Sequence, residues 1–176
     1  MPRPLRIRLK RCKILYIRLL LFILGRALPR AVRVSRQVKN RARRFPRNYR
    51  ILLGVREPGP VLLIESDGEG GLYRVSSGGN VPDLEIRFKS IEAAFRLFTF
   101  RESTAASEAA GRLIVSGSLA MVLDFIRIID AEEILLLPRF LAKRAVKLWQ
   151  KPPGLFFKRL ALYLSLLLPA PKRRNP

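Results

Sequence analysis

Histidine is absent from the 176 residues of this chain, and Cys12 is its single cysteine. The lack of histidine excludes Ser-His-Asp and Cys-His nucleophilic arrangements and removes the commonest transition-metal ligand. A single cysteine permits no disulfide within the chain, so nothing in the fold requires an oxidising compartment. We therefore expect a protein that is not an enzyme, that carries no metal or cofactor, and that suits a reducing cytoplasm.

Two short motifs that suggest chemistry have simpler structural explanations. Gly68-Glu69-Gly70-Gly71 lacks both the Gly-x-Gly-x-x-Gly spacing and the lysine of a phosphate-binding loop, so we interpret it as a hairpin turn. Glu132 and Glu133 are neighbours in the chain, and neighbouring helical residues point about 100° apart. The pair therefore indicates a solvated helix surface rather than a catalytic carboxylate pair.

Long hydrophobic runs are also lacking. The apolar stretch at residues 14–24 is interrupted by Arg18 and is shorter than the roughly 20 residues that a membrane-spanning helix needs. Residues 25–31 make a poor cleavage site, and the dense arginines that follow oppose export. We therefore expect neither a secretory signal nor a membrane span, and we interpret both ends of the chain as interfacial.

Acidic residues are missing from both ends of the chain. Residues 1–50 contain 17 Lys and Arg and residues 134–176 contain 10, without an Asp or Glu in either segment. Residues 51–133 contain 8 basic and 13 acidic residues. A mildly acidic middle is thus flanked by two cationic segments, which is typical of a protein with a polyanionic partner such as anionic lipid or nucleic acid.

The apolar residues of the N-terminal segment recur with helical spacing. Over residues 10–28 one face contains Ile14, Ile17, Leu21, Leu24 and Leu28, and three arginines lie in an opposing arc. We expect Pro29 to end this helix and a second basic helix to occupy residues 31–45. Both helices are predicted to form an arm that is separate from the folded domain.

The C-terminal segment, residues 138–176, repeats this chemistry. Pro138 opens a basic helix, Pro152-Pro153-Gly154 is a hinge, and residues 155–168 are mostly apolar. Aliphatic residues opposite basic ones suit insertion at the headgroup boundary of an anionic membrane, where each nearby basic residue adds about 1 kcal/mol. We therefore predict membrane-associating arms at 1–50 and 138–176. The residues predicted to contact the membrane are Ile14, Ile17, Arg18, Leu21, Leu24, Trp149, Phe156, Phe157 and Leu160.

The middle of the chain changes to strands and short helices. Ser90 is expected to cap a helix that begins at Ile91, and Gly117-Ser118 to turn the chain into a very apolar helix over 119–129. The small residues of 103–111 are interpreted as a connection. Apolar or alternating runs bounded by turn residues predict strands at 61–64, 72–75, 83–89 and 112–116.

Three of these elements occur in a recognisable order. They are the alternating strand Asp83–Phe88 with an apolar helix after it, then Gly111-Arg112-Leu113-Ile114-Val115-Ser116-Gly117, then an apolar helix from Leu119. In order and spacing, residues 82–138 resemble the sterol carrier protein type two domain and its lipid-binding relatives among bacterial accessory factors of ubiquinone biosynthesis. In that family the Gly-basic-Leu strand leads through a glycine into a helix that walls a hydrophobic tunnel. Family members often have an acid after the second glycine, where this chain has Ser118.

The resemblance implies an α+β domain at 51–137, in which helices cover a sheet of four or five strands and enclose an apolar cavity. Each lining residue has an ordinary alternative as part of a packed core. Burying a chain of about ten methylenes contributes on the order of 8 kcal/mol before ordering costs, so such a site needs no strong polar anchor. The predicted lipid-binding residues are Phe95, Phe98, Phe100, Leu113, Val115, Leu119, Met121, Val122, Phe125, Ile126 and Ile129.

The sequence therefore predicts a lipid carrier or accessory protein, associated peripherally with the cytoplasmic face of an anionic membrane. The resemblance implies a sterol-like lipid, an acyl chain or an isoprenoid quinone precursor as ligand, and biosynthetic enzymes as further partners. Two alternatives stay open: a basic nucleic-acid-associated protein, and a scaffold whose cavity is filled by its own side chains. Few aromatic residues are interleaved with the N-terminal arginines, which favours the membrane over nucleic acid.

Overall fold

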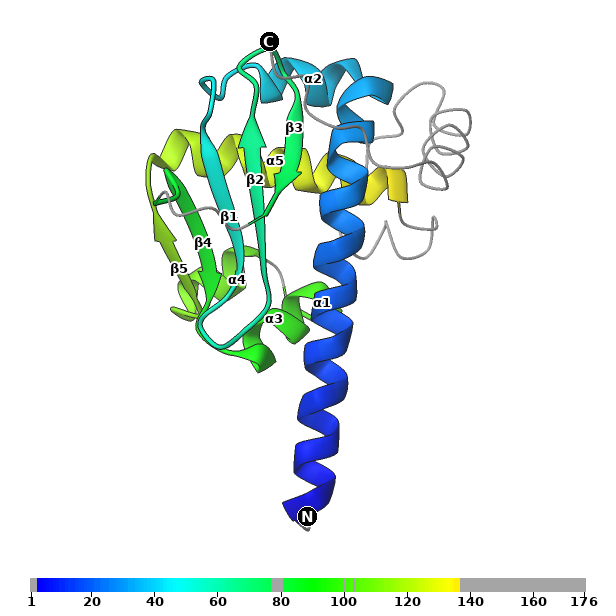
Figure 1. Ribbon diagram of the computed structural model, residues 1–176. Helices are drawn as coiled ribbons and strands as arrows, with labels where there is room; N and C mark the ends of the chain where they lie inside the picture. The colour runs from blue at the N-terminus through cyan, green and yellow to red at the C-terminus, as the bar shows by residue number, and fades with distance from the viewer. Residues whose placement is uncertain (1–2, 77–80, 100, 103, 137–176) are drawn as a thin grey trace.

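The computed structural model has the predicted α+β architecture and describes residues 3–76, 81–99, 101–102 and 104–136. A five-stranded mixed sheet is packed against helices (Figure 1). In chain order the elements are α1 (Arg3–Val34), α2 (Arg36–Ala42), β1 (Arg50–Val55), β2 (Val61–Ser66), β3 (Leu72–Val75), β4 (Leu84–Phe88), α3 (Ile91–Phe98), α4 (Thr104–Ala109), β5 (Leu113–Ser116) and α5 (Leu119–Leu136).

The sheet has the strand order β3-β2-β1-β4-β5, so the first strand of the chain lies at its centre. β1 is parallel to β4, with Leu53 opposite Ile86, and the other three pairings are antiparallel. Because side chains alternate along a strand, the register assigns one set of residues to each face of the sheet. Ile51, Ile64 and Leu84 are fully buried on the face that the helices cover.

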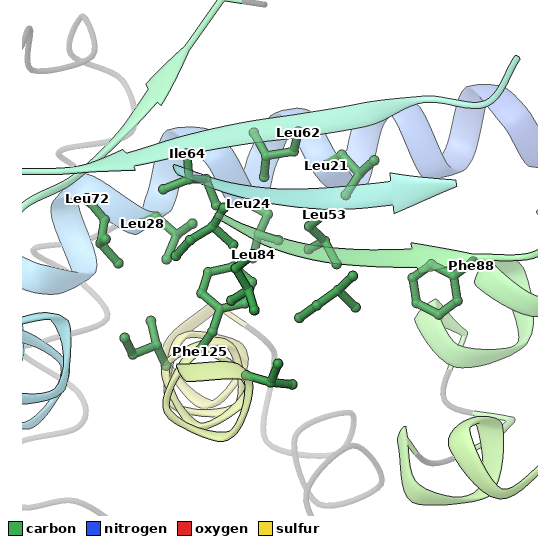
Figure 2. Packing of buried hydrophobic residues seen from close by; sticks show 14 of the residues in the cluster. Leu21, Leu24, Leu28, Leu53, Leu62, Ile64, Leu72, Leu84, Phe88 and Phe125 are labelled. Atoms are coloured by element: carbon green, nitrogen blue, oxygen red, sulfur yellow. The ribbon is translucent and has the colours of Figure 1, made fainter. Parts of the chain in front are cut away.

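The core lies between this face and the helices. Figure 2 shows side chains from α1, from the sheet and from α5 meeting in one apolar cluster. Leu28 of α1 and Phe125 of α5 are each 1% exposed, and Leu62 of β2 is 2% exposed. The opposite face of the sheet carries two ion pairs, Arg50–Glu65 at 3.1 Å and Arg87–Glu85 at 3.0 Å.

The N-terminal helices differ from the prediction, because they are part of the domain core rather than a separate arm. Ile17, Val38 and Phe45 are fully buried in the same cluster as the strands. The domain therefore begins well before residue 51, the predicted boundary. The apolar stripe of α1 was correctly identified, but it is covered by the sheet rather than by lipid.

Pro29 does not end α1, contrary to the prediction. The helix continues through it to Val34, and Ser35, with an extended backbone, separates it from α2. A proline inside a helix removes one backbone hydrogen bond and costs about 3 kcal/mol. Burial of Ala27, Leu28 and Ala31 against the core offsets that cost, since a helix that stopped at Pro29 would leave these residues without their partners.

The predicted turns and caps of the middle segment are confirmed. Ser90 caps α3 by accepting a hydrogen bond from the Ala93 amide at 3.1 Å. The β2–β3 hairpin turn is closed by Asp67, whose carboxylate accepts hydrogen bonds from the amides of Glu69 and Gly71 at 2.8 and 2.7 Å. Two elements were not predicted: the central strand β1, and α4 within the small-residue stretch.

Candidate lipid-binding face

The predicted site residues come from three elements around β4. In the sheet, Phe88 is opposite Leu113, and Ile86 is opposite Val115. Residues opposite each other in neighbouring strands point to the same face, so Leu113 and Val115 lie on the helix-covered side. The ring of Phe98, at the end of α3, lies 5.5 Å from the ring of Phe88. Thus α3 and β5 contribute to one apolar region around Phe88.

Helix α5 has a buried face and a more exposed apolar flank. Val122 and Phe125 are buried at 4% and 1% and belong to the core. At 100° per residue, Leu119, Leu123 and Ile126 share the flank of α5 opposite Asp124. Leu119 is 66% exposed and Leu123 46% exposed, and Ile126 is partly buried against the core. The apolar surface of α5 is therefore wider than core packing uses.

We name the surface formed by Phe98, Leu113, Val115, Leu119, Leu123 and Ile126 the carrier face. Val115 is 39% exposed, and Phe98 and Leu113 are partly buried against the core. The carrier face is thus continuous with the core on one side and reaches the surface on the other. Leu123 was not among the predicted residues, although its spacing of four from Leu119 was available in the sequence as a signal.

The other predicted lipid-binding residues have varied positions. Phe95, Met121 and Ile129 are partly buried against the core. Phe95 also packs edge-on against Tyr16 of α1, with ring centroids 5.4 Å apart. Phe100 lies outside the described residues. Their role in lipid binding stays a prediction.

A polar cluster holds the other flank of α5. Asp124 is 5% exposed, and its carboxylate accepts two hydrogen bonds from one nitrogen of Arg44, each 3.1 Å long, while a nitrogen of Arg41 lies at 3.6 Å. Arg41 lies in the last turn of α2 and Arg44 lies two residues beyond its end, so the cluster fastens this end of α2 to α5. These two arginines balance a buried carboxylate, in addition to any role in attracting anions.

Asp130, further along α5, is a partly buried acid. Burial raises the pKa of its carboxyl above the ordinary value of 3.8, because the charged form loses hydration. Asp130 lies one turn after Ile126 and about 40° from it around the helix, near the exposed apolar flank. The low polarity around Asp130 is consistent with the apolar character of this side of α5.

A small hollow of about 210 Å³ lies beside α3, but most of the residues that line it are charged or polar and none is a large apolar residue. Lys89, Glu92, Arg96 and Arg112 contribute to it, together with Ser90, Ala93 and Gly111. Arg112 is also ion-paired with Glu102. Lipid pockets are usually larger and mainly apolar. We therefore locate the candidate site on the carrier face and not in this hollow.

The residues predicted to contact the membrane differ in how exposed they are. Ile17, Leu21 and Leu24 are buried in the core at 0%, 3% and 8% exposure, and Ile14 is partly buried against it. For these residues the structure corrects the prediction, because a side chain covered by the sheet is not available to lipid. Arg18 is exposed, and its contact with a membrane stays a prediction. Trp149, Phe156, Phe157 and Leu160 lie outside the described residues.

Within the described residues, no helix is long and apolar enough to cross a membrane. Among the same residues, no group of three or more His, Cys, Asp or Glu side chains is arranged to hold a metal ion.

The fold and the site together define a class of small α+β domain, in which helices cover one face of a mixed sheet and partly exposed apolar side chains lie beside the core. No family model matches the sequence, and no curated protein matches it. Similar solved structures do exist, and those described next are sterol carrier protein 2 or SCP2-like domains, the family that the sequence resembles.

One of these structures is a UbiJ-SCP2 ubiquinone synthesis protein, with 19% identity and a TM-score of 0.46 over 68% of this chain and 96% of that one. Another is the sterol carrier protein domain 2 of Helicoverpa armigera, with 16% identity and a TM-score of 0.46 over 75% and 92%. A third is Sterol Carrier Protein 2 Like 2 from Aedes aegypti, with 12% identity and a TM-score of 0.34 over 54% and 92%. The function proposed below rests on this chain's own contacts.

Proposed function

We propose that this protein binds a hydrophobic molecule on its carrier face and holds it at the cytoplasmic surface of an anionic membrane. The observation that carries the proposal is the continuity of the carrier face from the closed core to exposed Val115 and Leu119. An apolar surface that is rooted in the core and open at its rim suits an apolar ligand more than a charged substrate. The ligand is transferred or presented, and not chemically changed.

The energetics of such a site favour a long hydrocarbon group. Each methylene removed from water contributes about 0.8 kcal/mol, so a chain of about ten methylenes contributes on the order of 8 kcal/mol before ordering costs. Phe98, Leu113 and Ile126 offer this kind of contact without a charged anchor. A sterol-like lipid, an acyl chain and an isoprenoid quinone precursor all satisfy this requirement, and the test must identify which is bound.

The test is native mass spectrometry of the purified protein, followed by organic extraction and identification of the extracted lipid. We expect one apolar molecule per chain. Val115→Glu places a charge on the carrier face and is expected to lower ligand occupancy at least tenfold. Leu119→Glu serves as a second variant, because an acid in the first turn of α5 is compatible with the helix dipole.

The matched control is Ile114→Glu. Ile114 is 37% exposed and adjacent to Val115 on β5, but it points to the opposite face of the sheet, where Arg87 is its register partner. Ligand occupancy should be unchanged in this variant. Protein that is empty as purified and that also fails to load added fatty acid, sterol or quinone would contradict the proposal and favour a scaffold with a filled interior.

A further inference from the structure

We propose that the outer face of α1 is the surface that docks on the anionic membrane. This outer face comprises Arg11, Leu15, Arg18, Leu19 and Phe22, together with Arg74 of β3. The inference deepens the proposed function, because it names the membrane-contact surface, and it rests on that proposal for the membrane as partner. It also replaces the buried residues of α1 as the membrane-contact set.

The geometry of α1 separates two apolar stripes. Ile17, Leu21 and Leu24 recur at spacings of four and three and are covered by the core. Leu15, Leu19 and Phe22 recur at the same spacings, but at 100° per residue they lie roughly 140° to 160° away from Ile17 around the helix. They are 67%, 54% and 47% exposed. Within the described residues, no neighbouring element covers this second stripe to the degree that the sheet covers the first.

Exposed apolar side chains are concentrated on this helix. Of the ten large apolar side chains that are most exposed in the described part of the chain, four are on α1: Leu15, Tyr16, Leu19 and Phe22. Tyr16 is held against α3, where its hydroxyl donates to the Phe98 carbonyl at 3.3 Å. The remaining three form the stripe. Contiguous exposed apolar side chains usually mark an interaction site.

The charges around the stripe select an anionic partner. α1 contains no acidic residue along its whole length. Arg11 and Arg18 are exposed and lie one turn before Leu15 and one turn before Phe22, respectively. Arg74 reaches the stripe from β3, with its guanidinium carbon 5.3 Å from the centre of the Phe22 ring. The apolar side chains therefore have a cationic border of three arginines.

An anionic bilayer matches this arrangement better than a protein or a nucleic acid. Leu15, Leu19 and Phe22 are able to enter the acyl boundary while the bordering arginines stay among lipid phosphates. A nucleic acid would use the arginines but would leave two exposed leucines without an apolar partner. Figure 1 shows that the first turns of α1, which precede Leu15, extend past the sheet and α3.

The test is flotation of the full chain with vesicles of 30% phosphatidylglycerol and 70% phosphatidylcholine. We expect Leu19→Glu to lower the partition coefficient at least tenfold. The matched control is Val81→Glu, which makes the same charge change at an 85% exposed site outside α1, and which should change binding less than twofold. Wild-type protein should retain part of its binding in 0.5 M NaCl, because apolar insertion survives screening.

Cys12 provides a second measurement without any added residue. It is the single cysteine, it is exposed, and it lies one turn before Leu15 on the same side of α1. A polarity-sensitive fluorophore on Cys12 should shift its emission to the blue when anionic vesicles are added. The same fluorophore in Cys12→Ser/Val81→Cys protein should not shift.

Two outcomes would overturn the inference. The first is equal vesicle binding by the wild type and by Leu19→Glu. The second is a wild-type dimer that Leu19→Glu converts to a monomer without altering vesicle binding, because the partner of the outer face would then be a second copy of the chain. Lipid content measured by native mass spectrometry separates the two proposals. Leu19→Glu should keep its bound ligand, and Val115→Glu should keep its vesicle binding, so either proposal is able to fail alone.

Discussion

The two long faces of α1 have similar side chains and opposite environments. The inner face presents Ile17, Leu21 and Leu24 to the sheet, and the outer face presents Leu15, Leu19 and Phe22 to solvent, with arginines beside them. A stripe of aliphatic residues at helical spacing indicates that something apolar covers a helix, but it does not identify the cover. Only the tertiary contacts distinguish a sheet from a membrane.

The largest expected effect is a difference in stability between two variants, each with one leucine truncated on one face of α1. Leu21→Ala should lower the free energy of unfolding by about 3 kcal/mol, because Leu21 is 3% exposed and its loss leaves a cavity. Leu19→Ala should change it by less than about 0.5 kcal/mol, because Leu19 is half exposed. Urea unfolding followed by circular dichroism measures both values. Equal losses would contradict the assignment of the two faces.

The next effect concerns the contact between α2 and α5. Asp124→Asn should destabilise the protein by about 2 kcal/mol, because the buried carboxylate that pairs with Arg41 and Arg44 is lost. The loss is expected below the range for fully buried pairs, since Arg44 is largely exposed and regains hydration. Arg127→Gln, at an exposed site on the same helix, is the control and should be close to neutral. An Asp124→Asn protein with unchanged free energy of unfolding would show that the ion pairs of Asp124 do not fasten the N-terminal helices to the domain.

A smaller change in the opposite direction is expected at the proline within α1. Pro29→Ala should stabilise the protein by about 1 kcal/mol, as the gain in helix propensity of about 3 kcal/mol exceeds the packing lost at a buried site. Thermal unfolding measures the shift. Pro46→Ala, at an exposed site outside the helices, should not stabilise the protein. A destabilised Pro29→Ala would mean that packing of the ring matters more than helix geometry.

The smallest effect is a pH dependence at Asp130. Its raised pKa means that the folded protein holds this proton more tightly than the unfolded chain does, so stability falls as pH rises from the ordinary value near 3.8 through the raised one. Asp130→Asn removes this loss. The variant should therefore be slightly more stable than wild type at pH 7, and the difference should shrink at pH 4. A difference that does not vary with pH would contradict the burial of this carboxyl.

Strands and turns of the middle segment were predictable because their signals are local. Alternation over residues 83–89 fixed β4, and the glycines after Asp67 fixed the hairpin between β2 and β3. β1 was missed because Gly54 interrupts a short apolar run directly after the arginine-rich segment. Its central place in the sheet depends on pairing with β2 and β4, which no local pattern contains.

The sequence predicted which elements form the candidate site, but not how deeply each of its residues is buried. The sequence identified α5 as unusually apolar, and the structure divides that surface between core residues such as Phe125 and rim residues such as Leu119. That division depends on where α2 contacts α5, and so on Asp124 and its arginine partners. Asp124 is an acid among apolar residues, and its pairing with arginines about 80 residues away is not visible in one sequence.

The packing of α1 against elements that follow it in the chain also affects how the protein folds during synthesis. α1 leaves the ribosome before the elements that cover it, since its inner face packs against β2 and β3, and Phe125 in the same core follows about a hundred residues later. At roughly 5–20 residues per second, this helix spends seconds with both apolar faces uncovered. The nascent chain therefore exposes a cationic helix with two apolar stripes, and folding then covers one of the two.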